Sequence, residues 1–105
     1  MKKRKFGKEH KEWRQKLIDR DKGCVICGET NRMAAHHLIP ECSKFEKYAR
    51  DIDNGVMLCP THHIWGIWSA HKNPIWFSNW LKENRIYQFV TASSRLGVLE
   101  DENTI

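Results

Sequence analysis

The sequence predicts a small α+β domain, and three observations lead to this fold class. A chain of 105 residues has room for one domain with a modest core. Residues 33–40 and 55–60 are short apolar runs of strand length, the first stopped by Pro40. Segments with apolar residues at helical spacing flank these runs. We therefore expect a strand–loop–strand–helix (ββα) unit with further helices around it.

A helix is expected before the first strand, over residues 6–22. Phe6, Trp13 and Leu17 recur there at helical spacing, while lysines and arginines cover most of the rest. Gly23 can end this helix. The expected helix would pack its aromatic face on the body of the domain.

The other elements are expected between and after the strands. The polar connection over residues 41–55 is expected to hold one helical turn. A helix is expected from Thr61 to about Ala70, and another over residues 73–84, with Pro74 in its first turn. Residues 85–90 are expected to form a late strand or an extended segment.

The charge is uneven along the chain and divides it into three parts. The net charge is +5, yet residues 1–22 alone carry ten basic against four acidic residues. We expect a basic N-terminal helical arm over 1–22, a core over 23–81 and a C-terminal extension over 82–105 that is either part of the same domain or loosely ordered. A basic arm suits a polyanion such as DNA, because each cation on a phosphate releases counterions. The alternative is a solubilising tail.

The cysteines point to a reducing environment. No apolar run is long enough to cross a membrane, and the N-terminus lacks the apolar stretch of an export signal. A cytoplasmic location, in a bacterial or phage-infected cell, is therefore expected. There a C-x-x-C pair is more often metal-binding or redox-active than a structural disulfide.

Two knuckle-like pairs predict a structural zinc site. They are Cys24-x2-Cys27 and Cys59-x2-His62, with 31 residues between the inner cysteines. Three thiolates and one imidazole form a set that Zn²⁺ accepts in closed tetrahedral sites. A redox pair would leave Cys59 and His62 without a role. Cys42 could replace His62 as a ligand, but it has no partner at knuckle spacing and is expected to be a free, partly buried thiol.

Three histidines and an amide remain after the zinc ligands are assigned. They are His36, His37, His63 and Asn54. Imidazoles that converge beside a basic arm suit metal-assisted attack of water on a phosphodiester. The alternative is that these are ordinary loop and core histidines.

The segments CVIC, AAHHLIP and DNGVMLCPTHHIW together resemble the HNH endonucleases over roughly residues 24–81. The resemblance implies a ββα-metal (HNH/His-Me finger) core with structural zinc and flanking helices. The further match of HKNP and Trp80 is similar to small phage and prophage HNH proteins. It also implies DNA as a partner and possible phage packaging or recombination proteins.

The family pattern implies a role for each matching residue. His37 would be the general base and Asn54 would hold the loop that orients it. His36 and His63 would bind one catalytic divalent ion, Mg²⁺ or Mn²⁺. Asn54 could instead ligate that ion, and either His62 or His63 could face zinc, although spacing favours His62. Ile67 stands where some relatives carry a further histidine.

His36 and His37 pose a geometric problem. Adjacent residues of a regular strand face opposite ways, yet both roles require one cleft. We therefore expect a bulge at this point or the end of the strand.

Several other residues are expected to contact DNA, mostly through phosphates. They are Lys2, Lys3, Arg4, Lys5, Arg14 and His71. His71 has a second interpretation, as the cap of the helix that follows. Trp65 and Trp68 are expected in the core more than at a base-stacking surface.

The function expected from these observations is that of a metal-dependent endonuclease which nicks or cleaves DNA. The alternative is a zinc-stabilised DNA-binding module without catalytic activity, which has no need of the three unassigned histidines. A secreted bacteriocin nuclease fits poorly with the absence of an export region.

Overall fold

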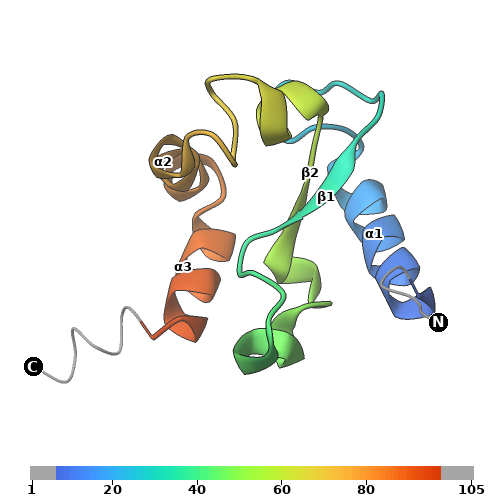
Figure 1. Cartoon of the computed structure of the whole chain (residues 1–105), viewed down its shortest axis with the longest axis vertical. Helices are drawn as coiled ribbons and strands as arrows, with labels where there is room; N and C mark the ends of the chain where they lie inside the picture. The colour runs from blue at the N-terminus through green and yellow to red at the C-terminus, as the bar shows by residue number, and fades with distance from the viewer. Residues whose placement is uncertain (1–6, 98–105) are drawn as a thin grey trace, which may run out of the picture.

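The computed structural model describes residues 7–97, which contain a two-stranded sheet, three α-helices and three short helical turns (Figure 1). In chain order the elements are α1 (Lys8–Asp21), β1 (Ala34–His37), η1 (Ser43–Tyr48), η2 (Ile52–Asn54), β2 (Gly55–Leu58), η3 (Thr61–Trp65), α2 (Pro74–Asn84) and α3 (Ile86–Arg95). The fold is α+β, as the sequence predicts, and the middle of the chain forms the expected pair of strands followed by the short η3 turn.

The two strands form an antiparallel ribbon at the centre of the molecule. His36 pairs with Val56, and His37 pairs with Gly55. Side chains alternate along a strand, so the two histidines face opposite sides of the ribbon. Helix α1 lies on one side, and helices α2 and α3 lie on the other (Figure 1).

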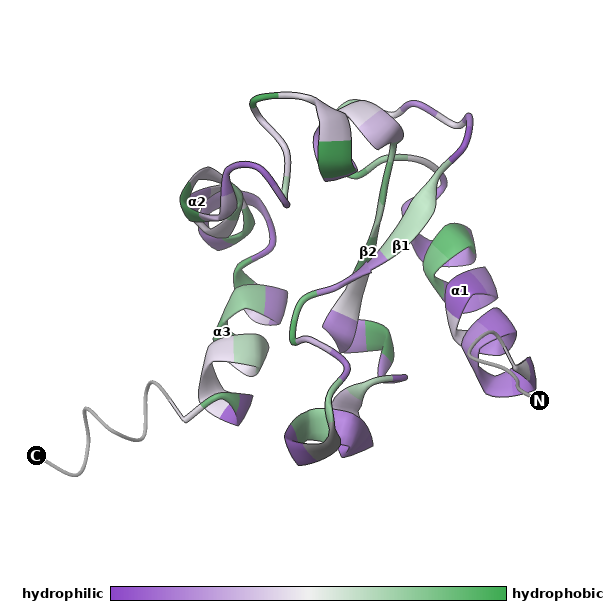
Figure 2. Cartoon of the chain, viewed as in Figure 1, coloured by the Kyte–Doolittle hydropathy of each residue, from purple (hydrophilic) through white to green (hydrophobic). Residues whose placement is uncertain are grey.

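Helix α1 packs on β2 through a small aromatic and aliphatic cluster. Trp13, Leu17 and Met57 are buried together. A Cβ atom at Gly55 would overlap the Trp13 ring and lie 2.7 Å from Leu17 Cδ1. Gly55 therefore allows α1 to approach the strand closely. The rest of α1 is mainly hydrophilic (Figure 2).

The opposite side of the ribbon carries the larger core. Val56 and Leu58 of β2 pack with Phe77 and Leu81 of α2. Ala70 and the buried cysteines Cys24 and Cys59 complete this cluster. The core thus reaches both knuckle segments, so their backbone is anchored in the hydrophobic interior.

Three local expectations from the sequence are wrong. Residues 86–95 form helix α3 instead of a strand, and the helix that begins at Thr61 is a five-residue π-helical turn that ends at Trp65. Trp65 and Trp68 are exposed instead of lying in the core. The N-terminal part of the basic arm, with Phe6 and Lys2 to Lys5, lies outside the described residues.

Helix α3 is held in place by contacts with residues far away in the sequence. The buried side chain of Gln88 donates hydrogen bonds to the carbonyl oxygens of Gly55 (3.1 Å) and Asp53 (3.0 Å). These contacts hold the helix against the start of β2. Within residues 7–97, no helix combines the length and apolar character needed to cross a membrane.

Candidate functional site

The first knuckle is a tight turn that joins α1 to the sheet. The Gly28 amide donates to the Cys24 carbonyl oxygen at 2.8 Å, and Gly28 has φ = 85°, a conformation that favours glycine. The Val25 amide donates to the Met57 carbonyl oxygen at 3.0 Å. This turn is therefore attached directly to β2.

The second knuckle begins where β2 ends. Cys59 follows the last residue of the strand, and its carbonyl oxygen accepts from the His63 amide at 2.8 Å. The η3 turn directs His62 toward the cysteines and the next residue, His63, toward another group of side chains. Successive residues of a helical turn point in different directions, which explains the separation.

The first cluster has the dimensions of a tetrahedral zinc site. Cys27 Sγ lies 3.7 Å from Cys59 Sγ, and His62 Nδ1 lies 3.4 Å from Cys59 Sγ and 3.8 Å from Cys24 Sγ. Ligands about 2.3 Å (sulfur) and about 2.0 Å (nitrogen) from a tetrahedral zinc are separated by about 3.5–3.8 Å. The four side chains can therefore hold one zinc ion with little movement.

The chemistry of these thiols also favours a cation. Burial, together with the neighbouring Cys59 and Cys24 thiols, raises the pKa of Cys27 to about 11. Several thiolates cannot be held this closely unless a positive charge offsets their repulsion. Zinc binds the thiolate form, so its binding would release protons from this cluster.

A second cluster consists of His36, His63 and His71. The ring centroids of His36 lie 5.2 Å from His63 and 5.1 Å from His71. His63 Nε2 and His71 Nε2 are 3.1 Å apart, a spacing expected for two ligands of one ion with bonds of about 2.1 Å. The three residues could hold a second metal ion.

Backbone hydrogen bonds bring His71 into this cluster. After η3 the chain turns back, so that the Ala70 amide donates to the His62 carbonyl oxygen at 2.8 Å. The His71 amide likewise donates to the His63 carbonyl oxygen at 3.0 Å. His71 does not cap α2, because the N-cap is Asn73, whose Oδ1 accepts from the Trp76 amide.

Burial favours the unprotonated form of two histidines in the second cluster, His36 and His63. Burial, assisted by the His63 and His71 imidazoles, lowers the pKa of His36 to about 3. Burial and His71 also lower the pKa of His63. A metal requires the unprotonated imidazole, so this environment already supplies the ligand form.

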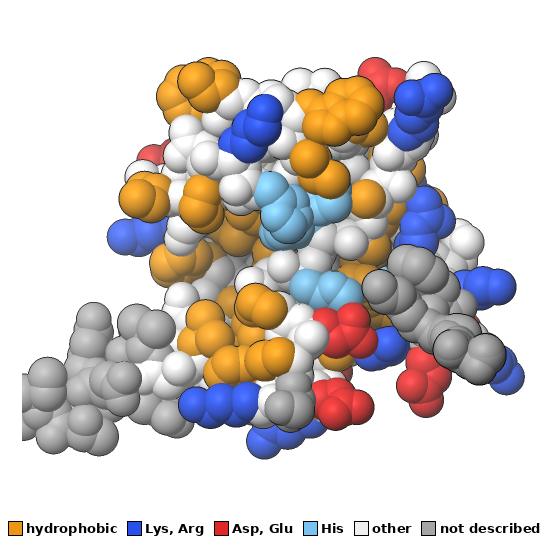
Figure 3. Space-filling view, viewed as in Figure 1, with side chains coloured by type: hydrophobic (Ala, Val, Ile, Leu, Met, Phe, Trp, Pro, Cys, Tyr) orange, Lys and Arg blue, Asp and Glu red, His pale blue; other side chains and the backbone are white. Residues whose placement is uncertain are grey.

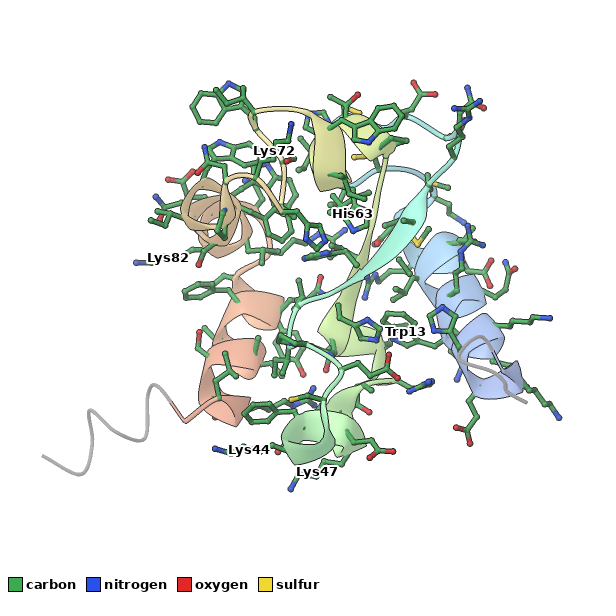
Figure 4. The ribbon with its side chains drawn as sticks, in the orientation of Figure 1. Trp13, Lys44, Lys47, His63, Lys72 and Lys82 are labelled. Atoms are coloured by element: carbon green, nitrogen blue, oxygen red, sulfur yellow. The ribbon has the colours of Figure 1, made fainter. Side chains whose placement is uncertain are left out.

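His37 lies on the other face of the ribbon, in a fixed orientation. Its ring stacks on Trp13 with centroids 4.3 Å apart and an angle of 18° between the planes. Its Nε2 donates to the Ala49 carbonyl oxygen at 3.0 Å, so Nδ1 carries the lone pair of the neutral ring. Trp13 itself lies between α1 and the sheet (Figure 4).

The strand remains regular up to His37 and ends there, so no bulge is needed. His36 and His37 both line one hollow of about 310 Å³ beside α2 and α3. A second hollow, of about 590 Å³, reaches His37 from the side of α1 and includes Lys11 and Arg14. His37 is therefore accessible from two directions.

Asn54 joins the end of β1 to the start of β2. Its buried Oδ1 accepts from the Ile39 amide at 2.8 Å, and its Nδ2 donates to the Ile39 carbonyl oxygen at 3.3 Å. Both polar atoms of the amide are thus engaged with backbone two residues beyond His37. This arrangement fits a loop-holding role better than metal ligation.

Sequence reasoning did not assign His71 to the histidine cluster or Trp13 to the side of His37. His71 follows His63 by eight residues, and only the return of the chain after η3 brings them together. The stack of Trp13 on His37 depends on the close approach permitted by Gly55. The sequence offered one hint of a role for His71: it is a histidine with no other metal-binding residue at the spacing of a ligand pair.

Comparison with known proteins relates the two clusters to a nuclease family. The family model of the HNH endonucleases matches residues 24–65. The match spans both knuckles, His36, His37, Asn54 and His63, and confirms the HNH resemblance for this segment. His71 lies beyond the matched residues. No curated protein and no solved structure matches the chain.

Proposed function

We propose that the protein is a metal-dependent endonuclease that nicks or cleaves DNA. The carrying observation is the presence of two separate clusters. Four Cys/His side chains have the dimensions of a zinc site, and three further histidines converge in a second cluster, whose His36 lines the same hollow as His37. A zinc-stabilised DNA-binding module would need only the first cluster.

In this proposal His37 activates the attacking water. The hydrogen bond from Nε2 to Ala49 leaves Nδ1 to accept the proton. Burial lowers the pKa of His37 below its ordinary value of 6.5, so the ring is unprotonated at neutral pH. The Trp13 stack restricts rotation of the ring, and Asn54 fixes the backbone beyond it. A general base must be held in this way to reach its substrate.

His36, His63 and His71 would hold the catalytic ion. When bound, a divalent ion supplies Lewis-acid stabilisation of the phosphate oxygens and the leaving group. Imidazole nitrogens suit transition-metal ions, whereas Mg²⁺ prefers oxygen ligands. Of the two ions expected from the sequence, Mn²⁺ is therefore the better fit to this cluster. Zinc is assigned to Cys24, Cys27, Cys59 and His62.

DNA would approach His37 over the basic side of the molecule. Lys11 and Arg14 line the hollow beside His37, and Arg14 is held by a hydrogen bond to the Met33 carbonyl oxygen at 3.1 Å. Lys2 to Lys5 belong to the same basic arm and could add phosphate contacts. Such contacts position a backbone without reading its sequence.

The test is cleavage of supercoiled plasmid by the zinc-loaded full-length protein with Mn²⁺ or Mg²⁺. We expect nicking with Mn²⁺, weaker nicking with Mg²⁺, and none with excess EDTA. His37→Ala should lower the rate at least 100-fold, because general-base catalysis contributes about 10²–10⁴. Lys82→Ala, an exposed residue of α2, is the control and should cleave normally. Equal inactivity of wild type and His37→Ala with both ions, alongside intact DNA binding, would favour the binding module.

A further inference from the structure

The loop between His63 and His71 exposes an unusual amount of apolar surface. Trp65 and Trp68 are 67% and 55% exposed, and Ile67 at the tip of the loop is 70% exposed. Ile64 and Ile75 are also exposed nearby in the chain. We call these five residues the indole surface. Large apolar patches on soluble proteins usually mark binding sites.

The indole surface is held in a defined position. Two backbone hydrogen bonds close its loop: the Ala70 amide donates to the His62 carbonyl oxygen, and the His71 amide donates to the His63 carbonyl oxygen. The Lys72 ammonium donates to the Trp65 carbonyl oxygen at 2.9 Å, and the Trp68 ring contacts Trp76 with centroids 5.7 Å apart. Whatever binds this surface is therefore fixed in relation to His63 and His71.

The surroundings favour nucleic acid over a protein as the occupant. Histidine side chains gather at the middle of one face, with hydrophobic side chains and a basic side chain directly above them (Figure 3). Lys72 places a cation beside Trp65, on the same loop as the proposed metal ligand His71. The loop that carries Trp65 and Trp68 begins at His63 and ends at His71, so its occupant lies next to the candidate metal ligands.

We propose that the indole surface stacks unpaired bases of a DNA strand next to the phosphate that is cut. The proposal rests on the proposed nuclease function and specifies its substrate: DNA with a single-stranded segment beside the scissile bond. In a duplex the base faces are covered by their neighbours, so an indole can stack only on a base that has left the helix. Lys72 would contact the backbone of the same strand.

The experiment measures binding, so that it does not depend on cleavage. Full-length, zinc-loaded His37→Ala protein is titrated against three fluorescein-labelled probes, followed by anisotropy. The probes are a 12-nucleotide single strand, a blunt duplex, and the same duplex with a single-stranded tail. We expect the single strand and the tailed duplex to bind more tightly than the blunt duplex.

Substitutions then test the indoles themselves. Trp65→Ala with Trp68→Ala should weaken binding of the tailed duplex by about tenfold or more, and leave the blunt duplex within about twofold. Trp65→Phe with Trp68→Phe should restore most of the lost affinity, because phenyl rings also stack. Tyr87→Ala removes an exposed aromatic from α3 and serves as the control, with no expected change.

Three outcomes of the measurements on the substituted proteins would overturn the proposal. The first is an equal loss on blunt and tailed duplexes, and the second is no loss on either. The third is a change in oligomeric state on light scattering with unchanged DNA binding, which would assign the surface to a second copy of the chain. If the wild-type protein cleaves plasmid DNA but binds tailed and blunt duplexes equally well, the nuclease function stands and only the base-stacking proposal is rejected. Tail-dependent binding without metal-dependent cleavage would instead reject the nuclease function.

Discussion

At the scale of single residues, neighbours in the chain are directed to different tasks by local geometry. His62 and His63 diverge because they occupy successive positions of the η3 turn. His36 and His37 diverge because they occupy successive positions of β1. The His62–His63 doublet thus supplies one residue to each cluster, whereas the His36–His37 doublet supplies His36 to the histidine cluster and places His37 on the other face of the ribbon.

The cysteines provide a residue-scale prediction with an internal control. Cys59→Ser should abolish stoichiometric zinc binding, because it removes one corner of the tetrahedron. Cys42→Ser changes an exposed thiol outside the cluster and should retain one zinc per chain. Elemental analysis after dialysis measures both. Loss of zinc from Cys42→Ser, or its retention by Cys59→Ser, would contradict the assignment.

At the scale of elements, Asp21 connects three parts of the fold. Its fully buried carboxylate accepts from the Met57 amide at 3.0 Å and from Arg85 at 2.9 Å, while Arg20 pairs with it from the same helix at 2.7 Å. The C-terminal end of α1 is thereby joined to β2 and to the start of α3. Both helices depend on this one side chain.

Asp21 also predicts a pH dependence of stability. Although burial opposes ionisation, the hydrogen bonds from Arg20, Arg85 and Met57 outweigh it and lower the pKa of Asp21 below its ordinary value of 3.8. The ionised group therefore stabilises the fold above that pH, and this contribution is lost as the pH falls through the lowered pKa. Asp21→Asn should cost about 3 kcal/mol of unfolding free energy at pH 7, by urea denaturation.

The control for this change is Asp19→Asn, an exposed position on the same helix. It should cost less than about 0.5 kcal/mol. The difference between wild type and Asp21→Asn should shrink as the pH is lowered below 3.8. A difference that stays constant down to pH 2 would contradict the role given to the carboxylate.

The elements that the sequence predicts well are those with a strong local pattern. The apolar face of α1, the two short strands and the Asn73–Pro74 start of α2 all carry such a pattern. Helix α3 also carries apolar residues at helical spacing, Ile86, Phe89 and Val90, and the expectation of a strand misjudged this period. What the sequence could not supply is the set of distant partners of Gln88 and Arg85.

The η3 turn ends at its C-cap residue, Gly66, where a Cβ atom would lie 2.6 Å from the Thr61 carbonyl oxygen. This glycine is a local stop signal, but the return of the chain that brings His71 beside His63 is a long-range feature.

At the scale of the whole molecule, the zinc site is expected to decide whether the chain folds. Small domains have a net stability of about 5–15 kcal/mol, whereas structural zinc binding contributes about 10–16 kcal/mol in small peptides. The knuckle cysteines Cys24 and Cys59 are themselves part of the larger core. Removing the ion therefore weakens the core directly.

Zinc removal should accordingly unfold the protein. We expect treatment with a strong chelator to abolish the cooperative thermal transition seen by circular dichroism. Addition of Zn²⁺ should restore it, and Mg²⁺ or Mn²⁺ should not, because thiolate ligands select the softer ion. An unchanged melting temperature in metal-free protein, verified by elemental analysis, would show that zinc is dispensable for the fold.

The site, like the fold, was predictable where its residues form a local sequence pattern. The spacing of Cys24, Cys27, Cys59 and His62 indicates four ligands without any structure, and the HNH pattern points to His36, His37, Asn54 and His63. What spacing cannot supply is the long-range geometry. His71 joins its cluster through a return of the chain, and Trp13 reaches His37 only because Gly55 has no side chain.

The central claim is that one doublet serves two metal sites, with His62 on zinc and His63 on the catalytic ion. The most direct measurement is plasmid cleavage with Mn²⁺ by His63→Ala protein whose zinc content has been determined on the same sample. The account predicts one zinc per chain, a wild-type melting temperature and a cleavage rate at least 100-fold below wild type. Zinc loss in His63→Ala, or undiminished cleavage with zinc retained, would contradict it.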